Sequence, residues 1–103
     1  MLTGKTYPLT IKAEQFDSSY HLVGMVDAQG QASLYATRGD TVSAGGETFL
    51  VCYTVSTTNV PNQPPRLKAG TVGILLFVNM HAIEAVGGIV PISIADNAAP
   101  SAP

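Results

Sequence analysis

The sequence predicts an all-β domain: a small, mostly antiparallel β-sandwich or open barrel of six to seven strands, with one short helix near residues 80–86. Two observations favour this class. Polar and apolar residues alternate in several short segments, as in half-buried strands. Asp, Asn, Gly and Pro separate these segments at short intervals. Because 103 residues suffice for one core, we expect a single β domain over residues 1–94 and an Ala-, Pro- and Ser-containing tail over residues 95–103.

Residues 7–16 form the first predicted strand. Leu9, Ile11 and Ala13 alternate there with polar residues, which places them on one face of a half-buried strand. Pro8 has no amide proton to donate to a neighbouring strand. The beginning of this strand is therefore expected at a sheet edge.

A hairpin is predicted to follow. Residues 20–26 form its first strand. The segment Asp27-Ala28-Gln29-Gly30 has Asp and Gly at the first and fourth positions of a type I turn, which returns the chain along residues 32–37. Arg38-Gly39-Asp40 is expected to interrupt that returning strand.

A second tight turn is predicted at Ala44-Gly45-Gly46, because glycine adopts positive φ without strain. Residues 47–55 are rich in β-branched and aromatic side chains and are assigned to the centre of the sheet. Residues 56–66 contain three prolines, which remove donors from a sheet ladder. This segment is therefore predicted to be a long exposed loop.

Residues 72–78 are a continuous apolar run, too short for a core helix, and are predicted to be a strand buried on both faces. Such a strand promotes aggregation when exposed, so we expect the rest of the fold or a neighbouring subunit to cover it. Asn79 can cap the short helix over residues 80–86, although a continued strand also fits there. Residues 89–94 alternate around Pro91, which assigns them to an edge or a bulge.

The chain is poor in charge. Hydrophobic residues make up 46% of it and charged residues 12%, with a formal net charge of -2; the charged share is about half the usual one. We therefore expect copies of the chain or another protein to cover part of the surface. A neutral surface of Thr, Ser, Asn and Gln is the alternative. Arg66 and Lys68 are the only close cations, too few to hold a nucleic acid.

Cys52 is the only cysteine, which excludes an intrachain disulfide and a multi-cysteine metal site. As a nucleophile it would need His21 or His81 beside it as a base. The alternation of residues 47–55 places Cys52 inside the central strand, where a small buried residue is expected. We expect Cys52 to be structural.

The other titratable residues form no catalytic or metal-binding set. His81 and Glu84 would share a helix face, but two side chains are too few for a stable metal site. Glu14 and Asp17 are both expected to be exposed, so no difference in environment separates an acid from a base. The glycine pairs lack the Lys and Ser or Thr of a phosphate-binding loop. We expect no enzyme activity, no cofactor and no metal.

Two short motifs are candidates for partner binding. Arg38-Gly39-Asp40 spells a cell-adhesion tripeptide where a hairpin tip is expected, but turn chemistry, in which Gly39 supplies the bend, is the favoured interpretation. The proline-rich loop has two prolines three residues apart with a cation nearby, the spacing of polyproline ligands. A rigid surface loop is the simpler interpretation. The candidate partner-binding residues are Pro61, Asn62, Gln63, Pro64, Pro65 and Arg66.

The segment Met1–Thr6 lacks the apolar core of a signal peptide, and the apolar run at 72–78 is far shorter than the ~20 residues that span a bilayer. We expect a location in the cytoplasm or a virion, without a membrane span. The low charge and the strand that needs cover predict a non-enzymatic structural or assembly protein. It would form homo-oligomers with itself or decorate a larger particle built from another structural protein, such as a viral capsid or tail. The alternative is a cytoplasmic protein-binding module or inhibitor that acts through loop 56–66.

Overall fold

A computed structural model describes residues 6–58 and 60–95, which form one antiparallel sheet. Its elements are β1 (Thr10–Lys12), the 3-10 turn η1 (Ala13–Gln15), β2 (His21–Asp27), β3 (Ala32–Ala44), β4 (Glu47–Thr54), β5 (Val72–Asn79) and β6 (Ile83–Pro91). The strand order is β1-β5-β4-β3-β2-β6. The predicted all-β class is confirmed, with six strands in a single sheet rather than two sheets packed as a sandwich.

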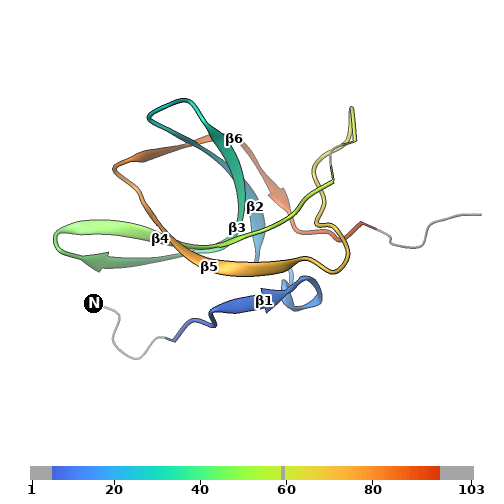
Figure 1. The fold of residues 1–103 in the computed structure, drawn as a ribbon, viewed down its shortest axis with the longest axis horizontal. Coiled ribbons are helices and arrows are strands. Elements are labelled where there is room, and N and C mark those ends of the chain that lie inside the picture. Colours follow the sequence, from blue (N-terminus) through green and yellow to red (C-terminus); the bar gives the residue numbers. More distant parts are fainter. Residues whose placement is uncertain (1–5, 59, 96–103) are drawn as a thin grey trace, which may run out of the picture.

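The sheet curls strongly, so that β2 to β6 surround a common interior (Figure 1). A short turn joins β5 to β6, in which the Ala82 amide donates to the Asn79 carbonyl oxygen at 3.0 Å. Despite that short connection, β6 pairs with β2 on the far side of the sheet. The strands thus form a partly open barrel, with the short β1 added outside β5.

The two faces of the sheet carry separate cores, because successive strand residues point to opposite faces. One core contains the aromatic trio Phe16, Tyr20 and Tyr53, whose rings meet edge to face at 5.0–6.3 Å. Its other buried members are Ile11, Leu22, Ala36 and Leu67. The second core contains Val23, Met25, Leu50, Cys52 and Val78.

Both predicted hairpin turns are present. The Gly30 amide donates to the Asp27 carbonyl oxygen at 2.9 Å, and the Asp27 carboxylate accepts from two further amides. Gly45 and Gly46 occupy the second turn with φ of 60° and 82°, the left-handed region that favours glycine.

The helix predicted over residues 80–86 is wrong. The Asn79 side chain does accept a hydrogen bond from the His81 amide at 2.9 Å, but the cap starts a turn and no helix follows. Strand β6 begins at Ile83 instead and pairs with β2, where Glu84 lies opposite Val26. A free edge on β2 offers this segment a ladder of backbone hydrogen bonds, and tertiary pairing overrides the local cap signal.

The first predicted strand is shorter than expected. Only Thr10–Lys12 pair with β5, and the chain then enters the 3-10 turn. The Lys12 amide donates to the Gln15 side-chain oxygen at 2.8 Å, which closes the turn and carries Phe16 into the core. The described residues contain no helix long and apolar enough to cross a membrane.

Candidate partner-binding surfaces

The proline-rich loop is folded on itself like a small hairpin. Thr57 and Leu67 form a bridge, and the Thr58 amide donates to the Arg66 carbonyl oxygen at 2.8 Å. At the tip, the Gln63 amide donates to the Val60 carbonyl oxygen at 3.2 Å. Asn62 has φ of 66°, as the third residue of a type II turn requires.

This tip conformation matters for the polyproline interpretation. A polyproline ligand is extended at every residue with φ near -75°, whereas Asn62 between Pro61 and Pro64 is left-handed. The loop therefore does not display a preformed polyproline helix. The four tip residues 61–64 are exposed, and Pro65 and Arg66 are half-buried. A partner-binding role for these six residues stays a prediction.

The base of the loop is anchored by the end of the described chain. Leu67 is fully buried, and its amide donates to the Ser93 carbonyl oxygen at 2.8 Å. The Ala95 amide donates back to the Leu67 carbonyl oxygen at 2.7 Å. In Figure 1 the loop leaves the sheet on the side where segment 92–95 ends. The predicted tail, residues 95–103, begins at this position, and all of it except Ala95 lies outside the described residues.

Strand β5 is not buried on both faces, which corrects the prediction. Val72, Ile74 and Phe77 keep 53%, 57% and 44% of their surface exposed. Val72 and Ile74 lie in the first half of β5, which pairs with the short edge strand β1, and Phe77 lies in the second half and projects from the opposite face. Phe77 is partly covered by the Tyr7 ring, whereas more than half of the Val72 and Ile74 surface remains exposed.

The exposed part of β5 continues onto β1 as one surface. Thr10 lies directly opposite Ile74, and Lys12 lies opposite Val72, and paired residues in an antiparallel sheet share a face. All four side chains are exposed. We call this surface the β1–β5 strip: Thr10, Lys12, Val72 and Ile74.

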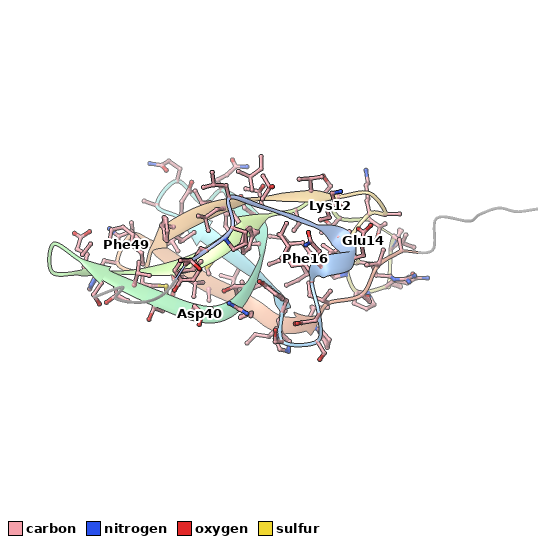
Figure 2. The ribbon with its side chains drawn as sticks, turned by 90° about the horizontal axis from the view of Figure 1, so that it is seen from below. Lys12, Glu14, Phe16, Asp40 and Phe49 are labelled. Atoms are coloured by element: carbon pink, nitrogen blue, oxygen red, sulfur yellow. The ribbon has the colours of Figure 1, made fainter. Side chains whose placement is uncertain are left out.

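The opposite end of the sheet has a second apolar surface. Val42, Ala44, Phe49 and Phe77 line a hollow on the β3–β4 hairpin, and the Tyr7 ring meets the edge of Phe77 at 6.4 Å. In Figure 2, Phe49 lies on that hairpin, toward the other end of the molecule from Lys12 and Glu14. Sequence alternation did not single out either surface, because it does not reveal which strand face lacks a covering layer.

Cys52 has the surroundings of a structural residue. It is fully buried, and burial raises the pKa of its thiol to about 12. His21 and Cys52 each pair with Thr37, so a whole strand separates them. A thiol that stays protonated and out of reach of solvent is a poor nucleophile.

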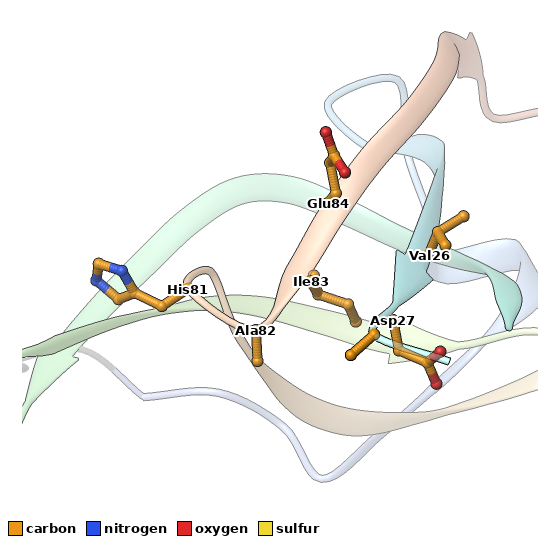
Figure 3. A pocket seen from close by; sticks show the side chains of 7 residues that line it. Val26, Asp27, His81, Ala82, Ile83 and Glu84 are labelled. Carbon is orange, nitrogen blue, oxygen red and sulfur yellow. The ribbon is translucent and has the colours of Figure 1, made fainter. Parts of the chain in front are cut away.

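His81 and Glu84 do not form a site together. They line a shallow hollow with Asp27 at the start of β6, but the three side chains point in different directions (Figure 3). The described residues contain no group of three His, Cys, Asp or Glu side chains able to hold a metal. The Asp17 carboxyl group accepts hydrogen bonds from Ser19, which lower its pKa.

The Arg38-Gly39-Asp40 motif lies within β3 and not at a hairpin tip, which corrects the expectation. Gly39 has φ of 90°, in the register irregularity between Thr37 and Thr41. The Arg38 guanidinium pairs with the Asp40 carboxylate at 3.1 Å and lies 5.3 Å from the centre of the Tyr20 ring. The two charges are directed to each other, and the glycine forms a strand bulge.

Comparison of the chain with protein-family models, curated proteins and solved structures gave no significant match.

Proposed function

We propose that this chain is a non-enzymatic structural or assembly protein, which forms homo-oligomers or decorates a larger particle such as a viral capsid or tail. The supporting observation is the exposure of β5. Its apolar side chains lie in an ordered sheet, yet Val72, Ile74 and Phe77 face solvent. Apolar side chains clustered on one strand favour a protein contact in a way that single scattered ones do not.

The strength of such a contact can be bounded. Full burial of a Val, Leu, Ile or Phe side chain stabilises by about 1.5–3 kcal/mol. Covering the exposed halves of Val72 and Ile74, which share a face, in two copies then contributes about 4 kcal/mol, against an association cost of about 4–15 kcal/mol. One contact of this kind is weak. Repeated contacts in a particle raise the overall affinity without any new chemistry.

The low charge supports the same proposal. Twelve per cent charged residues give little electrostatic repulsion between copies. The described ion pair between Arg38 and Asp40 is internal and neutralises two of those charges. Electrostatic repulsion between two copies is therefore weaker than between proteins with an ordinary share of charged residues.

Sedimentation velocity over a micromolar concentration series tests the proposal. The wild-type chain is expected to show a concentration-dependent increase in mean sedimentation coefficient. Ile74→Lys is expected to abolish it, because a buried unpaired charge is costly. Gln29→Lys, at the exposed β2–β3 turn, adds the same charge elsewhere and is the matched control. A monomer at all concentrations, with no larger assembly containing the chain, would overturn the proposal.

The alternative is a cytoplasmic protein-binding module or inhibitor that acts through loop 56–66. It is favoured by the loop's ordered hydrogen bonds, which present residues 61–64 in one conformation and so reduce the entropy cost of binding. Replacing these four residues by Gly-Ser-Gly-Ser separates the two functions. The replacement leaves self-association unchanged in the first case and abolishes partner capture in the second.

A further inference from the structure

Leu67 is the middle of a small three-stranded unit outside the main sheet. Thr57 forms an antiparallel bridge with it on one side, and Ile94 forms a parallel bridge with it on the other. The Leu67 amide donates to the Ser93 carbonyl oxygen at 2.8 Å, and the Leu67 carbonyl oxygen accepts from the Ala95 amide at 2.7 Å. The last described residues of the chain therefore satisfy both backbone polar groups of a fully buried residue.

Segment 92–95 is attached to the rest of the molecule by few contacts. Strand β6 ends at Pro91, the last residue that pairs with β2. Ile92 and Ile94 then pack, half-buried, against the core that contains the aromatic trio. Beyond Ile92, the two backbone–backbone hydrogen bonds of the segment within the described chain both go to Leu67. The segment can thus open while the ladders of the barrel stay paired, since units with few buried contacts unfold locally.

Opening of this segment removes the partners that hold the base of the proline-rich loop. The Leu67 amide and carbonyl oxygen lose their hydrogen bonds, and the Arg66 guanidinium loses the Ile94 carbonyl oxygen 2.6 Å away. The loop is closed beside them by the Thr58 amide, which donates to the Arg66 carbonyl oxygen at 2.8 Å. Because an unsatisfied buried polar group is costly, Arg66 and Leu67 are expected to leave their positions, and the Thr58 bond is expected to open with them.

We infer that segment 92–95 is a latch on loop 56–66: its pairing with Leu67 keeps the loop folded, and its release unfolds the loop while the barrel stays intact. By thermodynamic linkage, a partner that binds the folded loop tightens the latch. A molecule that captures the free segment weakens that partner's binding by the same factor. This consequence for partner binding rests on the alternative function proposed for the loop, whereas the latch itself does not.

Hydrogen exchange measured by NMR tests the latch. Ile94→Ser removes a half-buried apolar side chain and is expected to accelerate exchange about tenfold at the amides of Thr58, Leu67 and Ala95 alike. Amides in the paired parts of β3 and β4 are expected to exchange as slowly as in the wild type. Ile89→Ser makes the same change at a side chain that is 68% exposed and is the matched control, which is expected to leave all these rates unchanged.

A reversible lock tests the same opening from the other direction. The parallel bridge at Ile94 places Lys68 beside Ala95, so a disulfide in Lys68→Cys/Ala95→Cys is expected to hold the segment closed. Exchange at the Thr58 amide, whose own hydrogen bond the disulfide does not touch, is expected to be about tenfold slower in the oxidised chain than in the same chain after reduction. Cys52 does not interfere, because it is fully buried and its thiol stays protonated.

The exchange rates distinguish a latch from simple fraying of the segment. Faster exchange at Ala95 with unchanged exchange at Thr58 in Ile94→Ser, or equal exchange at Thr58 in the oxidised and reduced chains, overturns the latch. Equal acceleration of the β3 and β4 amides also overturns it, because the segment would then open only with the whole fold. Joint acceleration at Thr58, Leu67 and Ala95 above an unchanged barrel supports the latch. Partner binding that survives replacement of residues 61–64 overturns the alternative function and leaves this support intact.

Discussion

The Arg66 guanidinium donates a hydrogen bond of 2.6 Å to the backbone carbonyl oxygen of Ile94. This bond joins the proline-rich loop to the last described segment, 28 residues further along the chain. Together with the backbone bonds of Leu67, it makes the loop and the C-terminal segment one structural unit. The predicted partner loop and the beginning of the predicted tail are therefore mechanically coupled.

Arg66→Ala is expected to loosen that unit. A hydrogen bond from a charged group contributes about 1.5–3 kcal/mol when buried, and because Arg66 is half-buried we expect a loss of about 1 kcal/mol. Hydrogen exchange should accelerate at the amides of Thr58 and Ala95. Lys68→Ala removes an exposed cation two residues away and is the control. Unchanged exchange at both amides in Arg66→Ala would contradict the coupling.

Cys52 gives the protein a pH dependence in alkaline solution. Burial raises the pKa of its thiol to about 12 from the ordinary value of 9.0. Because the folded chain holds the proton more tightly, stability is fully present below about pH 9 and decreases as the pH rises towards 12. Urea unfolding of Cys52→Ala is expected to show lower stability overall but a shallower decrease over this range. Tyr20 and Tyr53, whose pKa values burial also raises, keep part of the slope. If stability decreased equally steeply with pH in the wild type and in Cys52→Ala, Cys52 would not be the source of this pH dependence.

Gly73 is required by the close packing behind the β1–β5 strip. A Cβ atom there would lie 2.9 Å from the Thr54 carbonyl oxygen and 3.0 Å from both Phe16 Cζ and Tyr53 Cβ. Backbone atoms cannot yield cheaply, so Gly73→Ala is expected to destabilise the fold by about 1–3 kcal/mol in urea unfolding. Val72→Ala, one residue away and exposed, should change stability by about 0.5 kcal/mol at most. Similar urea unfolding midpoints for Gly73→Ala and Val72→Ala would show that the atoms around Gly73 can move to accept a Cβ atom.

Predictions that depend on contacts between neighbouring residues were correct, and those that depend on contacts between distant parts of the chain were not. The Asp27–Gly30 turn was predictable, because the hydrogen bonds that close it join residues within one four-residue segment. The helix at 80–86 failed because Ile83 to Pro91 find a partner in β2, more than fifty residues earlier in the chain. The cap at Asn79 was predicted correctly. It competes with the backbone pairing of β6 and β2, which no local sequence pattern reveals.

The candidate surfaces show the same division. The sequence located loop 56–66 through its prolines, while the left-handed Asn62 and the Arg66–Ile94 bond depend on the folded loop. It also identified residues 72–78 as an apolar strand that needs cover. Which of its side chains lack cover depends on the position of β5 beside the short edge strand β1.

The amino-acid sequence by itself therefore determined the β class, the two hairpin turns and the shortage of charge, because these arise from residue chemistry and contacts a few positions apart. Only the tertiary structure decided that β6 pairs with β2, that Cys52 is fully buried and that Val72 and Ile74 remain exposed. Strand order and sheet curvature set these features, and they depend on all strands at once.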